Sequence, residues 1–127
     1  MIDHVSLGVR DLPAAATFYD AVLAPLGFAR IYDLEETVGY GKEHPEFWLN
    51  VRPNMPYVPK DTGIHVCLRA SDTEAVDAFH AAGLASGATD DGPPGLRPQY
   101  LPSYYAAFLR DLDGNRVEIV TFVEGKS

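Results

Sequence analysis

Two histidines and one glutamate occupy strand positions from which they could bind a metal ion together. His4 and His65 each begin a run that alternates apolar and other residues, and Glu118 lies within a third such run. Alternation places each of the three side chains opposite its apolar neighbours in the strand. An unpaired carboxylate among apolar strands would be costly. Two imidazoles and a carboxylate are a common ligand set for a divalent metal with open positions. The alternative is that each histidine is a hydrogen-bonded residue of the core or rim.

The two histidines belong to an internal repeat. His4-Val5-Ser6-Leu7 and His65-Val66-Cys67-Leu68 are 61 positions apart, and Phe18 and Phe79 have the same spacing. A period close to half the chain indicates two similar modules rather than a solenoid. Each module is expected to place a histidine at the same point of its first strand.

Hydrophobic periodicity and turn residues predict the order β-α-β-β-β, used twice, which is an α+β fold. In the first module we expect a helix that starts near Pro13 and ends by Gly27, with strands over 2–9, 28–33, 36–41 and 46–52. In the second we expect a helix that begins with a capping box, Ser71-Asp72-Thr73-Glu74, and strands over 63–70, 103–110 and 116–123. Residues 92–102 are too rich in Gly and Pro for regular structure and are predicted to be a loop, whereas Asp111–Asn115 is predicted to be a hairpin turn.

The 127 residues are expected to form one domain. Its first module covers about 1–53, a proline-containing connector covers about 53–61, and its second module covers about 62–124. The net charge of −8 argues against nucleic acid and anionic membrane surfaces as partners. The single cysteine allows no internal disulfide, and no apolar run is long enough to span a membrane. The N-terminus lacks the pattern of a signal peptide, so we expect a cytoplasmic protein.

Aromatic and polar residues on the same strands are candidates for a substrate pocket, although each aromatic could equally belong to the core. Arg69 and Arg110 could hold an anionic group, because guanidinium matches carboxylate or phosphate geometry, or could pair with internal carboxylates. The predicted pocket residues are Tyr40, Trp48, Asn50, Tyr104, Phe108 and Arg110.

Several short segments spread over essentially the whole chain carry a family resemblance. They are Ile2-Asp3-His4-Val5, Asp11-Leu12-Pro13, Phe18-Tyr19, Leu26-Gly27-Phe28, Gly63-Ile64-His65-Val66, Asp111-Leu112-Asp113-Gly114-Asn115 and Val117-Glu118-Ile119. In these segments the sequence resembles the vicinal oxygen chelate superfamily, which includes glyoxalase I, fosfomycin-resistance enzymes, extradiol dioxygenases and bleomycin-resistance proteins.

The resemblance implies paired modules that form an open, cup-shaped mixed sheet around one divalent metal, and a tendency to form homodimers. It gives His4, His65 and Glu118 as the metal ligands, from one chain or from two. Relatives similar to glyoxalase I use a fourth carboxylate ligand, but Trp48 stands at the aligned position, and indole cannot bind a metal. Zn, Mn, Fe, Co and Ni are not distinguished by this ligand set.

Three functions remain open from the sequence. The first is a metal-dependent enzyme, of the isomerase, lyase, transferase or dioxygenase type, that acts on a small oxygenated substrate. In such an enzyme Glu118 would be the catalytic residue that moves a proton, or a metal-bound hydroxide would do so. The second is a metal-free binding protein of the bleomycin-resistance type, which would hold a planar compound against Trp48. The third, less favoured because of the polar residues in the cup, is a structural or regulatory dimer.

Overall fold

Strand β1 (Val5–Val9) pairs in parallel with β4 (Pro45–Val51), although a helix and two strands separate them in the chain. The computed structural model describes residues 1–123. In the first module, α1 (Leu12–Leu23) and a short 3₁₀ turn (Ala24–Leu26) precede β2 (Ala29–Asp33) and β3 (Thr37–Gly41). The resulting mixed sheet has the order β1-β4-β3-β2.

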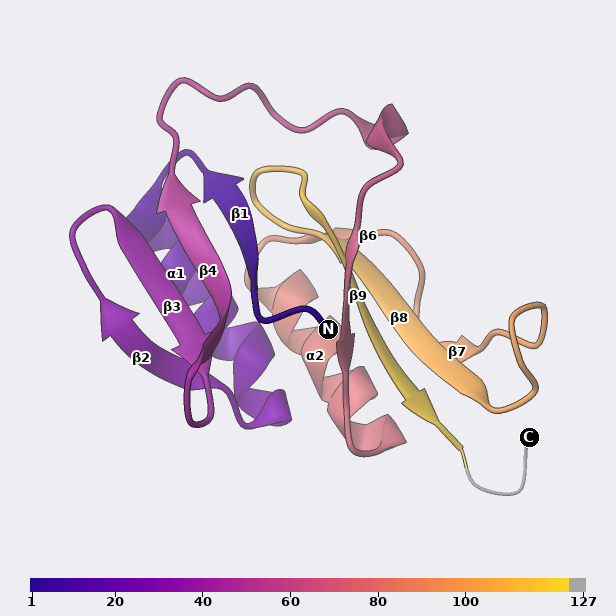
Figure 1. Cartoon of the computed structure of the whole chain (residues 1–127). Helices are drawn as coiled ribbons and strands as arrows, with labels where there is room; N and C mark the ends of the chain where they lie inside the picture. Colours follow the sequence, from indigo (N-terminus) through magenta and orange to yellow (C-terminus); the bar gives the residue numbers. More distant parts are fainter. Residues whose placement is uncertain (124–127) are drawn as a thin grey trace.

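The second module repeats this arrangement. Strand β5 (Val66–Arg69) is followed by α2 (Thr73–Ala85), β8 (Tyr104–Arg110) and β9 (Arg116–Phe122), and β5 runs parallel to β9. Two short strands, β6 (Thr89–Asp90) and β7 (Gly95–Leu96), both pair with β8. A 3₁₀ turn (Lys60–Thr62) lies in the connector between the modules. The described residues therefore form two open mixed sheets with one helix each, which confirms the predicted α+β class (Figure 1).

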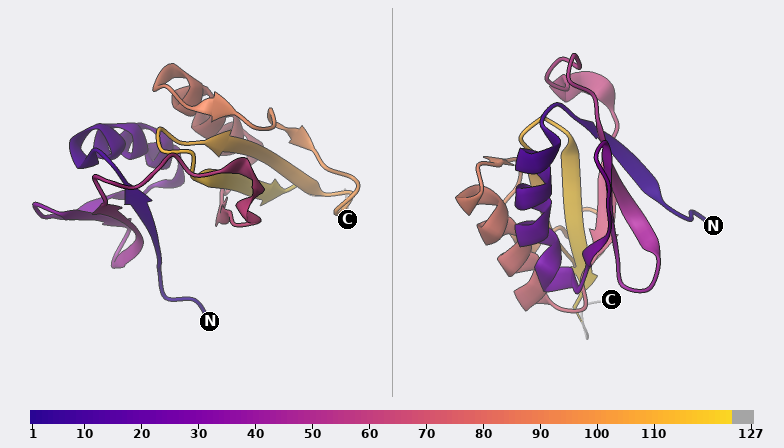
Figure 2. Two further views of the ribbon diagram at one scale, coloured as in Figure 1. Left: turned by 90° about the horizontal axis from the view of Figure 1, so that it is seen from above. Right: turned by 90° about the vertical axis from the view of Figure 1, so that its left-hand side faces the viewer.

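Both helices cover the same side of the molecule. They pack against each other and against one face of their own sheets, and the opposite sheet faces are left without helices (Figure 2). Phe18 and Val22 of α1 and Val76 and Phe79 of α2 are buried in the core between these layers. The uncovered faces are called the open faces below.

The predicted turn at Asp111–Asn115 joins the modules. The hydroxyl of Tyr19 donates to Asp111 Oδ2 over 2.6 Å. Arg10 donates to Asp113 from its backbone and side chain, and the Asn115 amide donates to the carbonyl of Gly8. These contacts attach the end of β1 and the start of α1 to the β8–β9 turn.

Three local predictions need correction. Strand β1 begins at Val5 rather than at residue 2. The N-cap of α2 is Asp72, whose side chain accepts from the Ala75 backbone, rather than Ser71. The segment predicted as a loop contains β7, because Gly95 and Leu96 pair with the edge of β8. The predicted end of α1 is confirmed: Gly27 adopts a left-handed φ of 79° after Pro25. No helix among the described residues is long and apolar enough to cross a membrane.

Candidate functional site

The open face of the second module carries a row of ionisable side chains. Cys67 of β5 is paired in register with Glu118 of β9, and Glu118 is paired with Phe108 of β8. Because successive side chains of a strand point to opposite faces, Val117 and Ile119 pack on the helix side and Glu118 points to the open face. This confirms the predicted orientation of Glu118.

Glu118 is the centre of the row. Its side chain is only 4% exposed, yet both carboxylate oxygens have partners. Oε1 lies 2.9 Å from His65 Nε2, and Oε2 accepts from the hydroxyl of Tyr104 over 2.5 Å. The His65 side chain is 37% exposed, so it connects the buried carboxylate to the surface. The structure thus brings together two of the three predicted metal ligands and one predicted pocket residue.

The neighbouring side chains are held in their neutral forms. Burial, assisted by the hydrogen bond to Glu118, raises the pKa of Tyr104 above its usual value, so its hydroxyl remains a donor at neutral pH. Partial desolvation of the thiol, followed by the nearby Glu118 charge, raises the pKa of Cys67 to about 12. A thiolate nucleophile at Cys67 is therefore disfavoured at neutral pH.

The third predicted ligand, His4, lies apart from this pair. It precedes β1, and its Nδ1 is 2.7 Å from the carboxylate of Asp3 in an exposed position. The N-terminal segment projects from the molecule on the side opposite the helices (Figure 2). Within residues 1–123, no three His, Cys, Asp or Glu side chains come close enough to hold a metal ion. Among the three predicted ligands, His65 and Glu118 converge in residues 1–123, and His4 does not join them.

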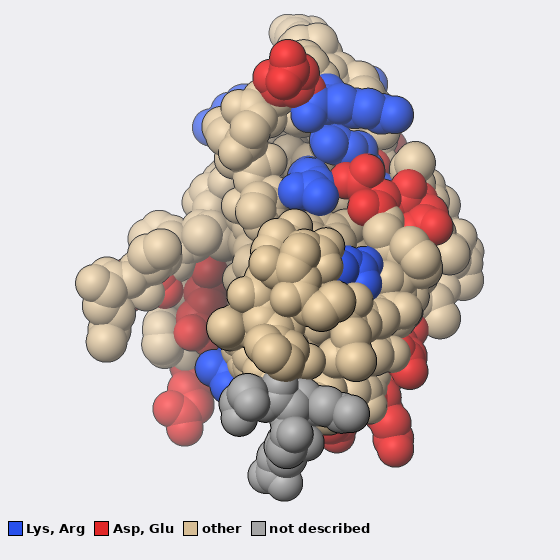
Figure 3. Space-filling view, turned by 90° about the vertical axis from the view of Figure 1, so that its right-hand side faces the viewer, with Lys and Arg blue, Asp and Glu red and all other residues tan. Residues whose placement is uncertain are grey.

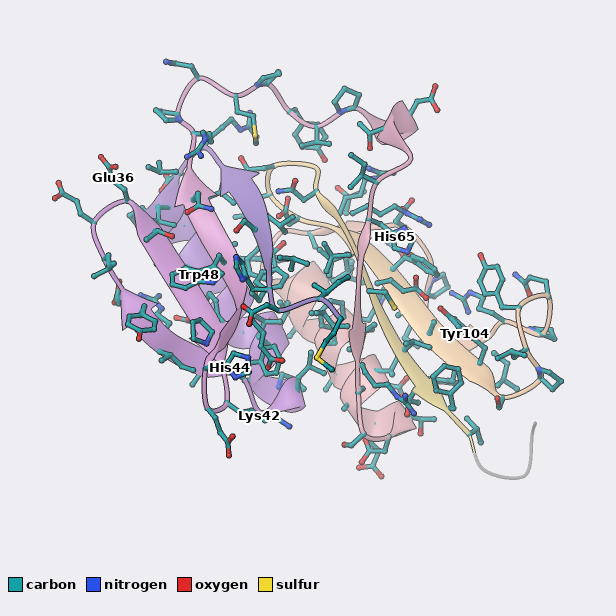
Figure 4. The ribbon with its side chains drawn as sticks, viewed as in Figure 1. Glu36, Lys42, His44, Trp48, His65 and Tyr104 are labelled. Carbon is teal, nitrogen blue, oxygen red and sulfur yellow. The ribbon has the colours of Figure 1, made fainter. Side chains whose placement is uncertain are left out.

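The predicted pocket residues of the first module divide between its two faces. Trp48 and Asn50 lie on the open face, where Tyr32 stacks on Trp48 with ring centroids 5.7 Å apart. Figure 4 shows Trp48 on the first module and His65 with Tyr104 on the second. The prediction for Tyr40 does not hold, because its register partner is Phe47 on the helix side. Its hydroxyl donates there to the carbonyl of Ala16 and lies 2.9 Å from Asp20.

Phe108 and Arg110 both lie on the open face of the second module, as predicted, but they are largely buried. Phe108 lies between His65, whose ring is 6.2 Å away, and the guanidinium of Arg116, which is 4.4 Å from the Phe108 centroid. Sequence reasoning overlooked Arg116. Its position two residues before Glu118 in the same strand was the available signal, since alternation places both on one face. Arg69 lies toward the other end of the face, over the ring of Phe122.

A hollow of about 220 Å³ adjoins His65 at the junction of the modules. Ser6, Leu7 and Gly8 of β1 line one side of it, and His65 and Val66 line the other. The site is thus accessible from the seam between the two modules. A molecule bound there would contact the imidazole of His65 before the carboxylate of Glu118.

Comparison with known proteins places this geometry in a family. The model of the Glyoxalase/Bleomycin resistance protein/Dioxygenase superfamily matches residues 1–119. A crystal structure of a glyoxalase/bleomycin resistance protein from Albidiferax ferrireducens T118 is 34% identical, with a TM-score of 0.78 over 93% of this chain and 95% of that chain. No curated protein matches the chain.

More distant structures share the fold. A glyoxalase/bleomycin resistance protein/dioxygenase family enzyme from Burkholderia phytofirmans PsJN is 21% identical, with a TM-score of 0.72 over 96% of this chain and 98% of that one. A glyoxalase-related enzyme from Fulvimarina pelagi is 19% identical, with a TM-score of 0.73 over 94% and 86%. At these identities the likeness concerns the fold alone.

Proposed function

The chain belongs to the Glyoxalase/Bleomycin resistance protein/Dioxygenase superfamily, and from this premise we propose that it is a metal-dependent enzyme acting on a small oxygenated molecule. One observation carries the proposal. Glu118 is buried in β9 between the apolar residues Val117 and Ile119, and its carboxylate converges with His65 next to a hollow. Burying a carboxylate costs free energy, and a purely structural role would not require it at this place.

We assign His65 and Glu118 as two ligands of one divalent metal ion and His4 of a second copy of the chain as the third. Support comes from the exposure of His4 and from the N-terminal segment that projects beyond its own module. This assignment requires a homodimer. The ligand set accepts Zn, Mn, Fe, Co or Ni.

The bound metal would supply Lewis-acid stabilisation of an oxyanion or enolate on the substrate. The residues of the chain would supply orientation and proton movement. The hydroxyl of Tyr104 donates to Glu118 Oε2 and thereby fixes the carboxylate plane. Glu118 would take up or return the substrate proton. Isomerase, lyase, transferase and dioxygenase reactions all fit this arrangement.

Metal analysis of protein purified without chelator or affinity metal tests the proposal. We expect about one metal per chain in the wild type and at least about a tenfold loss in His65→Ala and His4→Ala. The exposed His44→Ala variant is the matched control and should retain the metal. A His65→Ala protein that keeps its metal would contradict the ligand assignment.

Mixing two inactive variants tests whether the site spans two chains. Refolding His4→Ala together with Glu118→Gln forms heterodimers in which one of the two sites has all its ligands. About a quarter of the wild-type metal content should then return, because half of the dimers are mixed and each holds one intact site. If the mixture binds no more metal than its components, the third ligand does not come from a second copy.

A metal-free binding protein is the second candidate, and a specific observation favours it. Both oxygens of Glu118 already have hydrogen-bond partners, and Trp48 with Tyr32 presents an aromatic surface for a planar compound. Absence of metal after incubation with Zn, Mn, Fe(II) and Ni would support it. Because Trp48 is the single tryptophan, quenching of its fluorescence by planar compounds would report binding directly.

A further inference from the structure

Cationic side chains gather at one end of the second module's open face. Arg110 ends β8, Arg116 begins β9, and Lys60 reaches the same place from the connector. Together with three other residues they line a hollow of about 230 Å³; the full lining is Lys60, Gly63, Ile64, Asp91, Arg110 and Arg116. Figure 3, the view from the right-hand side of Figure 1, shows Lys and Arg side chains on the upper part of the molecule with Asp and Glu side chains beside them.

The hollow contains more positive than negative charge. Asp91 is the only acidic residue among its lining residues. Its Oδ2 accepts from Arg116 Nε over 2.6 Å and lies 3.6 Å from Arg110 Nε. Lys60 forms no salt bridge with any residue in 1–123. One carboxylate therefore faces three cations, although the whole chain carries a net charge of −8.

Arg110 is incompletely satisfied within the described part of the chain. Its side chain is only 7% exposed, and its buried Nε has no hydrogen-bond partner. Its other nitrogens reach the carbonyls of Gly114 and Lys60 only over 3.3 and 3.4 Å. A buried donor without a partner costs free energy, so the guanidinium of Arg110 is not fully compensated by the protein. Its positive charge would favour an anion in the adjacent hollow.

The cationic hollow adjoins the candidate site. Arg116 and Ile64 line both this hollow and the neighbouring one that includes His65. Phe108 supports both groups, since the Arg116 guanidinium stacks over its ring and His65 lies beside it. A small molecule held by an anionic group at Arg116 would extend toward His65 and Glu118.

We propose that this hollow binds a carboxylate or phosphate group of a small molecule, with Arg116 and Lys60 as the contacting cations. Arg110 acts from beneath as a positioning residue whose charge favours the anion. The identification of this molecule as the substrate rests on the proposed function, but the binding of the anion does not. The protein would accordingly select negatively charged small oxygenated compounds.

Side-chain NMR of the full chain, freed of metal with EDTA, tests the anion site separately from the metal site. The Nε–H signals of Arg110 and Arg116 are followed during titrations with sodium phosphate and with sodium acetate at constant ionic strength, with sodium chloride as the reference. Saturable shifts of both signals, and of the backbone amides of residues 60–64, are expected with at least one oxyanion. A stronger response to phosphate or to acetate identifies the preferred group.

Variants locate the binding. Arg116→Gln and Lys60→Gln should each weaken the oxyanion about tenfold, as expected for the loss of one charge-assisted contact. Arg52→Gln, directly after β4 and outside both hollows, should change nothing. Arg110 is not substituted, because its buried side chain contributes to the packing of the fold. Thermal unfolding verifies that each variant folds.

Shifts no larger than with chloride, or an Arg52→Gln effect equal to that of Arg116→Gln, would overturn the proposal. Failure of the metal site would not affect this result, because the titration uses metal-free protein. Conversely, Arg116→Gln should leave the metal content unchanged, so the two proposals can fail independently.

Discussion

Trp48 in β4 and Glu118 in β9 occupy equivalent positions of the two modules. Trp48 is paired with Ser6 of the first strand and with Gly39 of β3, whereas Glu118 is paired with Cys67 and Phe108. A large ring beside a glycine in one module thus corresponds to a small carboxylate beside a large ring in the other. Each open face therefore pairs a large ring with a smaller residue, but the ring lies on β4 in the first module and on β8 in the second.

The helix sides of the modules differ much less. Phe18 and Phe79 are both almost fully buried, 61 positions apart, and Val22 and Val76 pack in the same layer. The difference between the modules is therefore concentrated on the open faces, where Glu118 of the second module takes the position of Trp48 in the first. The scaffold is duplicated, and the candidate chemistry is not.

The largest effect should come from the shared scaffold. Phe18→Ala and Phe79→Ala are each expected to lower the free energy of unfolding by about 3–5 kcal/mol, because each removes a fully buried ring and leaves a cavity. Urea denaturation of the two variants measures both values. A cost below about 1 kcal/mol for either variant would show that the modules do not share equivalent cores.

The scaffold was predictable because it depends on patterns that are local in sequence. The alternation around Glu118 and the Pro25–Gly27 helix end each reflect a single strand or helix, and the 61-residue repeat shows that the same elements occur twice. The N-cap at Asp72 was missed, although it lies 61 positions after the N-cap Asp11 and the repeat could have identified it. The capping-box pattern and the repeat point to different residues, and the structure agrees with the repeat.

The site was less predictable because it depends on pairing between strands. His65 and Glu118 were assigned to one face from alternation alone, and the structure brings them together. Tyr40 was placed in the pocket because its strand was known but its face was not; its pairing with Phe47 turns it toward α1. The separation of His4 from the other two predicted ligands depends on how the modules pack, which no single strand encodes.

An intermediate effect should come from the aromatic open face. A Cβ at Gly39 would lie 2.8 Å from the Trp48 ring, so Gly39→Ala must displace the indole. We expect a loss of about 1–3 kcal/mol of stability and a shift of Trp48 fluorescence. Gly95→Ala in β7 is the control, since its Cβ would meet only Arg97 at 3.4 Å. Equal stabilities and unchanged emission would mean that the ring does not depend on this glycine.

A smaller loss of stability, similar in the two modules, should come from removing the N-cap side chain of either helix. Asp11 accepts from the Ala14 backbone and Asp72 from the Ala75 backbone. Asp11→Ala and Asp72→Ala should each cost about 1 kcal/mol in thermal or urea unfolding. Ser71→Ala should change stability by less than about 0.5 kcal/mol, since Ser71 is not the cap. A larger effect at Ser71 than at Asp72 would restore the capping box predicted from the sequence.

The smallest effect concerns the pKa values of two aspartates. Each of them contacts a helix residue, and these two helix residues occupy equivalent positions of α1 and α2. Tyr19 of α1 donates to Asp111, which lies in the other module, whereas His80 of α2 pairs with Asp90 of its own module. Burial raises the pKa of Asp111 above 3.8. The hydrogen bond from the Gly92 backbone, followed by the His80 contact, lowers the pKa of Asp90.

These opposite directions have opposite consequences for stability. For Asp111 the folded state binds the proton more tightly, so its contribution declines as the pH rises from 3.8 through the folded pKa. For Asp90 the contribution is complete above 3.8 and is lost as the pH falls through the lowered pKa. Carbon-13 NMR of the aspartate carboxyl groups should therefore show Asp90 titrating at lower pH than Asp111. The reverse order would mean that Asp111, in the contact between the modules, is better solvated than Asp90, in the contact within the second module.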